Sequence, residues 1–253
     1  MLYVETVGHG PDLVLLHGWG LHGGIWDGVR DALAPQFRLH IVDLPGYGQS
    51  PHCDPYTLAA LANEVAQVMP RRAHVCGWSL GGQVAMRLAL DFPQRVNKLV
   101  LLSTTPCFRR REDWPQAMDD TTMQEFACRL EQDYVGTLQR FLALQARSGD
   151  DARAVIAALR TQLFARGEPS LLSLRSGLAL LQDLDLREEV AGISHSTLVL
   201  HGARDTLTPL GSGEWLAQCL PNSQMNIVRG GAHAPFLSHR RETIIAMERF
   251  LNG

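Results

Sequence analysis

The chain has 253 residues, of which 45% are hydrophobic and 19% charged, so it can bury a sizeable core and is not a disordered protein. Its net charge of −3 at pH 7 gives no overall basis for binding nucleic acid or an anionic membrane. The five cysteines are scattered and none forms a C-x-x-C pair, so neither a disulfide framework nor a metal site is indicated. We expect no metal and no cofactor.

The start of the chain carries no evident targeting segment. Residues 1–6 lack a basic region followed by an apolar run, which a signal peptide would need. No apolar stretch elsewhere is long enough to span a bilayer. We therefore expect a cytoplasmic protein, and we expect it to be a monomer.

The first elements are two strands and a glycine-containing loop. Residues 2–6 alternate like an edge strand, and residues 13–16 form a continuous apolar run that is typical of a strand buried on both faces. A His-Gly-Trp-Gly sequence follows. It can be a simple turn. It can also supply an oxyanion donor, if Gly18 lets the backbone N–H of Trp19 point into a site while His17 holds the loop from behind.

A serine between two glycines is the central motif. Residues 39–42 and 73–76 are apolar runs that predict buried strands, and residues 58–68 between them have helical spacing. The second run leads into Gly-Trp-Ser-Leu-Gly, whose serine is Ser79, and residues 82–90 then have helical spacing. A strand, a sharp turn and a helix that meet at a serine predict a nucleophile elbow. The motif alone is also compatible with an ordinary strand-to-helix turn.

With a further apolar run at 99–103, strands and helices alternate through the first hundred residues. This alternation predicts the α/β class, with a mostly parallel sheet and helices on both faces. The strand signal then disappears from Phe108 to Glu188. Helical patterns replace it at 126–130, 134–146, 152–164 and 170–181.

We expect residues 108–188 to be a helical cap inserted into a core domain that is formed by residues 1–107 and 189–253. A capping box from Thr122 to Glu125 predicts the start of the first cap helix. The alternative is an ordinary helical layer beside the sheet. Arginines recur in this segment every six or seven residues, about two helical turns, and most such stripes are solvated faces. They are Arg140, Arg147, Arg153, Arg160 and Arg166.

Strands resume at 197–200 and 225–228, and a chemically reactive residue follows each of them. Asp205 comes after the first strand and His233 after the second, so both should meet Ser79 at the carboxyl edge of the sheet.

The three residues suit nucleophilic catalysis. Ser79 would be the nucleophile, His233 would take its proton, and Asp205 would accept the other ring N–H. The backbone N–H groups of Trp19 and Leu80 would form the oxyanion hole.

Three competitors for these roles are weaker. His239 lies in a polar stretch that opens a predicted helix. Asp183 and Asp185 lie inside the helical segment, away from any strand end.

The combination of His17-Gly18, the loop Asp43–Ser50 and the elbow at Ser79 resembles the α/β-hydrolase superfamily. Serine at position 79 separates the chain from the dehalogenase and epoxide-hydrolase branches, which use aspartate there. Residues 140–145 and 233–236 further resemble the pimeloyl-[acyl-carrier protein] methyl ester carboxylesterases of biotin synthesis. That family hydrolyses the methyl ester of a pimeloyl group held on acyl carrier protein.

This resemblance implies a substrate site and a partner. The acidic acyl carrier protein would dock on Arg140, Arg147, Arg153 and Arg160, although two further arginines of the family are replaced by Gly136 and Ala157 here. Two other hypotheses remain, a hydrolase of small esters or related acyl-transfer enzyme, and a non-catalytic binding protein. The implied substrate residues are Trp19, Ser79, Leu80, Phe141, Leu142, Ala143, Leu144, Gln145 and His233.

Overall fold

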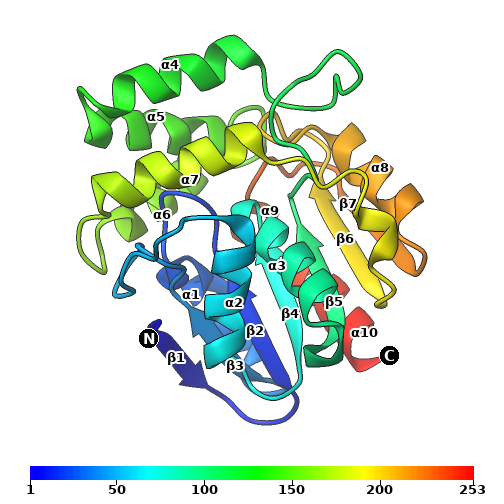
Figure 1. The fold of residues 1–253 in the computed structure, drawn as a ribbon. Coiled ribbons are helices and arrows are strands. Elements are labelled where there is room, and N and C mark those ends of the chain that lie inside the picture. Colours follow the sequence, from blue (N-terminus) through cyan, green and yellow to red (C-terminus); the bar gives the residue numbers. More distant parts are fainter.

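The computed structural model describes residues 1–253 and is organised around a seven-stranded sheet in the order β1-β3-β2-β4-β5-β6-β7 (Figure 1). β1 is antiparallel to β3, and every other neighbouring pair is parallel. The α/β class that the sequence predicts is therefore confirmed. The strands are β1 (Val4–Val7), β2 (Asp12–Leu16), β3 (Arg38–Val42), β4 (Ala73–Trp78), β5 (Val96–Leu102), β6 (Thr197–Gly202) and β7 (Ser223–Val228).

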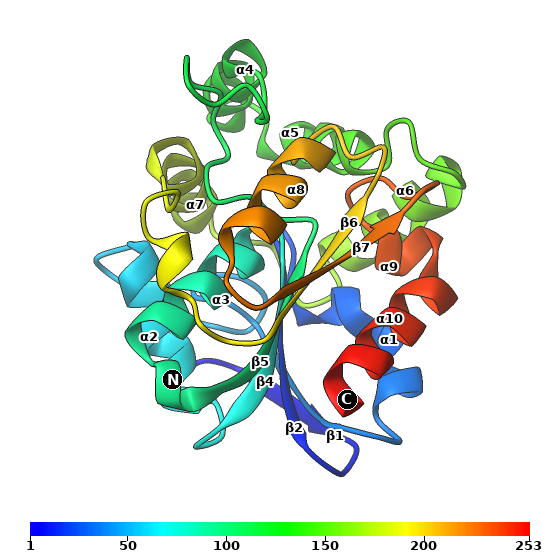
Figure 2. The same ribbon diagram turned by 90° about the vertical axis from the view of Figure 1, so that its right-hand side faces the viewer.

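Helices cover both faces of this sheet. Figure 2 shows α2 and α3 on one face and α1 and α10 on the opposite one. β4 and β6 are buried along their whole length, which explains their almost uninterrupted apolar sequences. None of the helices has the length and apolar character needed to cross a membrane. The helices that flank the sheet are α1 (Asp27–Leu33), α2 (Leu58–Val68), α3 (Leu80–Asp91), α8 (Leu210–Cys219), α9 (Pro235–Ser238) and α10 (Arg240–Asn252).

Residues 108–188, called the helical insertion from here on, connect β5 to β6 and lie over one end of the sheet (Figure 1). Four helices form at the places that the sequence predicts. The predicted capping box is wrong, however, because the first helix starts at Asp120 and its N-cap is Asp119, whose side chain accepts the N–H of Thr121 at 3.1 Å. The four helices are α4 (Asp120–Leu130), α5 (Tyr134–Gln145), α6 (Ala152–Leu163) and α7 (Leu171–Asp183).

A buried ion pair fastens the insertion to the sheet. Arg166, which follows α6, donates to Asp43 Oδ1 at 2.9 Å and also pairs with Glu5. The carboxylate of Asp43 is fully buried and accepts the backbone N–H groups of Gly23 at 2.7 Å and Gln49 at 3.0 Å. Arg166 therefore does not belong to a solvated face, unlike the expectation for arginines at this spacing. It neutralises a charge that would be costly to bury alone.

We expect Arg166→Ala to lower the free energy of unfolding by about 3 kcal/mol, because it leaves the buried carboxylate of Asp43 without a counter-ion. Urea denaturation followed by circular dichroism measures this change. Arg160→Ala is the control, since Arg160 is exposed and pairs with no carboxylate, and it should alter stability by less than about 0.5 kcal/mol. Equal stability of the two variants would contradict an anchoring role for Arg166.

Candidate active site

Ser79 has a strained backbone at the junction of β4 and α3. Its φ is 55° and its ψ is −120°, a conformation that L residues rarely adopt and that costs of order 1–3 kcal/mol. The glycines on either side leave room for this sharp turn. A Cβ on Gly77 would lie 2.2 Å from the carbonyl oxygen of Gly81, and a Cβ on Gly81 would lie 2.4 Å from that of Leu16. The elbow geometry therefore requires both glycines.

Neighbouring groups hold both sides of the Ser79 backbone. Its N–H donates to the carbonyl of Leu102 at 3.1 Å, and its carbonyl accepts the hydroxyl of Thr104 at 2.7 Å. The side chain then stands at the N-terminal end of α3, where the helix dipole favours negative charge. No sequence signal marks Thr104, because its partner lies 25 residues earlier in the chain.

Asp205 lies just past the end of β6 and is held by donors on every side. It accepts the N–H groups of Leu207 and Thr208, each at 2.9 Å, and the hydroxyl of Thr208 at 2.8 Å. The fourth donor is His233 Nδ1, at 2.8 Å. Burial alone would raise the pKa of Asp205, but the adjacent His233 and the other donors hold it below the usual value, so the group stays ionised.

The ring of His233 is thereby fixed in one orientation. With Nδ1–H bonded to Asp205, Nε2 carries the lone pair, and this atom is buried without a hydrogen-bond partner. The His233 backbone is also held, because its N–H donates to the carbonyl of Gln145 at 3.0 Å and its carbonyl accepts Trp78 Nε1 at 2.8 Å. No hydrogen bond joins Nε2 to Ser79 here, and such bonds often tighten only in a substrate complex.

His17 positions the peptide that leads to Trp19. Its Nδ1 donates to the carbonyl of Gly18 at 2.8 Å, and its Nε2 accepts the N–H of Leu44 at 2.9 Å. The carbonyl of Gly18 and the N–H of Trp19 belong to one planar trans peptide and point in opposite directions, so fixing the first aims the second. A Cβ on Gly18 would lie 3.2 Å from Ser79 Cβ, which places this peptide beside the serine.

His17 can fill this position only as a neutral ring. Its Nε2 must keep a lone pair to accept the N–H of Leu44. Burial lowers the pKa of His17 from 6.5 to about 4, although the nearby carboxylate of Asp43 acts to raise it.

The second expected oxyanion donor, the N–H of Leu80, is in the first turn of α3 and has no partner within the helix.

The predicted substrate segment of α5 divides between two sides of the helix. Phe141, Leu142 and Gln145 are buried, whereas Ala143 is exposed and Leu144 partly exposed. Phe141 packs edge-to-face on Trp19, with ring centroids 4.9 Å apart. Both polar atoms of the Gln145 side chain are buried without a hydrogen-bond partner, so they remain available to a ligand.

The competing acid and base residues are engaged elsewhere. His239 forms the N-cap of α10 and contacts Ser238 Oγ at 2.9 Å. Asp185 is bound by Arg187, and Asp183 is the last residue of α7. The structure thus brings Asp205, and none of these alternatives, to His233.

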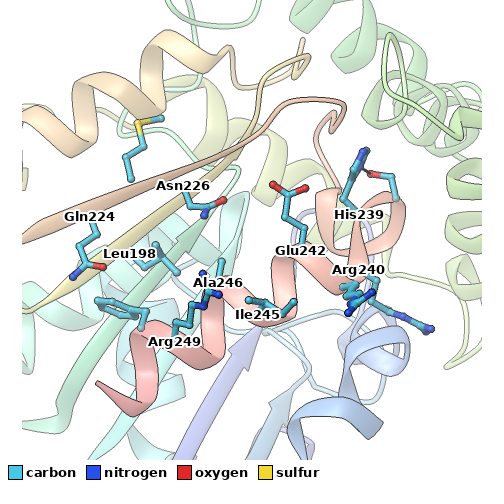
Figure 3. A pocket seen from close by; sticks show the side chains of 13 residues that line it. Leu198, Gln224, Asn226, His239, Arg240, Glu242, Ile245, Ala246 and Arg249 are labelled. Carbon is cyan, nitrogen blue, oxygen red and sulfur yellow. Dashed lines mark hydrogen bonds between the residues drawn. The ribbon is translucent and has the colours of Figure 1, made fainter.

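The catalytic candidates are closed off from solvent. Ser79, Asp205 and His233 are 5%, 6% and 1% exposed, and none of them lines the surface hollows of 330 to 790 Å³. The largest hollow lies between β7 and α10, where Figure 3 shows side chains such as Asn226 and Glu242. The largest hollow therefore does not contain the candidate triad. The candidate residue His233 instead contacts the helical insertion, through its bond to the carbonyl of Gln145.

Comparison with known proteins identifies the family of the chain. The family model of the α/β-hydrolase fold matches residues 11–240. The chain belongs to this family. Two α/β-hydrolase relatives, both named pimeloyl-[acyl-carrier protein] methyl ester esterase, cover nearly the whole chain. That of Nitrosomonas europaea is 47% identical over 94% of both chains, and that of Aeromonas hydrophila is 42% identical over 98% of both.

A solved structure shows the same α/β-hydrolase fold. The bromoperoxidase from Bacillus anthracis superposes with a TM-score of 0.92 at 25% identity, covering 100% of this chain and 95% of that one. The family resemblance inferred from the motifs is thus confirmed.

The buried, neutral His17 predicts a specific acid sensitivity. Unfolded His17 takes up a proton near pH 6.5 but folded His17 does so only near pH 4, so folding stability falls as the pH is lowered between these values. The loss should reach about 3 kcal/mol. His17→Gln should lack this part of the decline, as measured by urea denaturation of both proteins across this pH range. Parallel stability curves would show that His17 titrates normally.

Proposed function

We propose that the chain is a serine carboxylesterase that hydrolyses the methyl ester of pimeloyl-[acyl-carrier protein]. The observation that carries the proposal is the Asp205–His233 pair at 2.8 Å, because His233 Nε2 has no partner and the ring packs against Trp78, the residue that precedes the strained Ser79. The relatives with this esterase name, at 41–47% identity, support the choice of substrate. We also propose that the protein acts in the cytoplasm, as a monomer.

The first half of the reaction forms an acyl-enzyme. Ser79 Oγ attacks the ester carbonyl while its proton passes to His233 Nε2, and Asp205 stabilises the imidazolium that results. The negative charge on the carbonyl oxygen is met by the N–H groups of Trp19 and Leu80. The bond to the methoxy group then breaks, and His233 returns the proton so that methanol leaves.

The second half regenerates the serine. Water loses a proton to His233 and attacks the acyl carbon, and the bond to Ser79 Oγ then breaks as His233 protonates that oxygen. The product is a free carboxylate at the distal end of the acyl chain. The thioester to the carrier is left intact.

We further propose that residues 108–188 form a cap domain on which acyl carrier protein docks, with residues 1–107 and 189–253 as the core. Four exposed arginines on α5, α6 and the loop between them have no carboxylate within 4.0 Å, whereas six other arginines of the insertion are ion-paired. Unpaired cations are available to an acidic partner. The four are Arg140, Arg147, Arg153 and Arg160.

We expect Ser79→Ala and His233→Ala each to lower kcat by about four to six orders of magnitude, because the two residues act as one unit. The double variant should be hardly slower than either single one. Methanol release from the carrier-bound methyl ester measures turnover, with circular dichroism as the control for folding. Near wild-type turnover by either variant would refute the assignment.

Charge reversal at Arg140, Arg147, Arg153 and Arg160 together should reduce kcat/KM for the carrier-bound ester by about five- to a thousand-fold. The loss should shrink as salt screens the charges, and it should be absent for a small free ester. Steady-state kinetics on both substrates across ionic strength tests this. Equal losses on the two substrates would indicate that the substitutions damage the insertion. Unchanged kinetics on both would show that these arginines are solvated and do not contact the carrier.

A further inference from the structure

Two hollows share a pair of arginines where α4 meets α5. The first, of about 370 Å³, has Phe126, Ala143 and Leu144 among its lining residues. The second, of about 330 Å³, lies towards the start of α5 and is lined by polar side chains. Arg129 from α4 and Arg140 from α5 line both hollows. Two guanidinium groups from different helices therefore lie at the boundary between an apolar and a polar hollow.

These two arginines have no counter-ion within the protein. Neither Arg129 nor Arg140 has a carboxylate within 4.0 Å, although Glu125 lines the first hollow and Asp133 the second. Asp133 is already engaged as the N-cap of α5, where its Oδ1 accepts the N–H of Gly136 at 2.8 Å. The positive end of the α5 dipole adds to the charge of the two guanidinium groups. The boundary between the hollows is thus suited to an anion.

A series of packed aromatic rings connects the apolar hollow to the peptide beside Ser79. Phe126, which lines the hollow, packs edge-to-face on Phe141 with centroids 5.8 Å apart. Phe141 packs in the same way on Trp19, at 4.9 Å, and the Trp19 peptide lies beside Ser79. An extended apolar chain that displaced these rings would run from the hollow to the serine.

We propose that Arg129 and Arg140 bind the phosphodiester of the pantetheine arm that joins the acyl group to its carrier. This inference rests on the proposed function. It names the part of the substrate that would bind where the two hollows meet between α4 and α5. A guanidinium group matches phosphate oxygens with two parallel hydrogen bonds, and the methyl and methylene groups of the arm suit the apolar lining. Arg147, Arg153 and Arg160 line neither hollow, so they are left to contact the carrier protein itself.

Two small substrates separate recognition of the arm from docking of the carrier. Both carry the pimeloyl methyl ester as a thioester, one on pantetheine and the other on phosphopantetheine capped as its methyl phosphodiester. At low ionic strength, wild-type kcat/KM should be about tenfold higher for the substrate with the phosphodiester. Arg129→Gln should bring this ratio close to one, and Arg129→Lys should restore part of it, because lysine keeps the charge without the paired hydrogen bonds.

Arg72→Gln is the matched control, since Arg72 is an exposed arginine just before β4, outside the insertion, and should keep the wild-type ratio. A wild-type ratio near one, or a ratio that survives Arg129→Gln, would overturn the proposal. If the wild-type protein hydrolyses neither substrate, this result would instead contradict the proposed esterase function. Calorimetric binding of the capped phosphopantetheine alone then decides the matter, because Arg129→Gln must weaken this binding about tenfold if Arg129 and Arg140 hold the phosphodiester.

Discussion

The strained backbone of Ser79 is the constraint on which the rest of the site depends. A φ of 55° places the serine between β4 and α3 only because Gly77 and Gly81 carry no side chain and because Thr104 and Leu102 bind its peptide groups. A parallel sheet makes such an elbow useful, since its neighbouring strands end at the same edge. Asp205 and His233 reach that edge from β6 and β7, and Trp19 reaches it from β2. The fold thus assembles distant residues around one costly turn.

The helical insertion is part of this site as well as its cover. The carbonyl of Gln145, at the end of α5, accepts the backbone N–H of His233, and the carbonyl of Leu174 in α7 accepts Trp19 Nε1 at 2.9 Å. The proposed base and the proposed oxyanion donor therefore each hold a hydrogen bond to the insertion. Movement of these helices would disturb both groups together.

The sequence predicted those features that depend on neighbouring residues. Continuous apolar runs marked the buried strands, and the glycines around Ser79 marked the elbow, because each pattern is local. The arginine spacing places Arg166 in a stripe typical of a solvated face, yet Arg166 pairs with Asp43, 123 residues away. The support that Thr208 gives Asp205, and the division of α5 into a buried and an exposed side, depend on how loops and helices pack. No local pattern encodes such packing.

The most direct test of this account is mass spectrometry of the enzyme and the carrier after a single turnover of pimeloyl-[acyl-carrier protein] methyl ester. The account predicts that methanol is released, that the carrier keeps its thioester and gains a free carboxylate, and that a rapidly quenched sample holds the acyl group on the peptide containing Ser79. Release of a free carrier thiol, or acylation of any other residue, would contradict it.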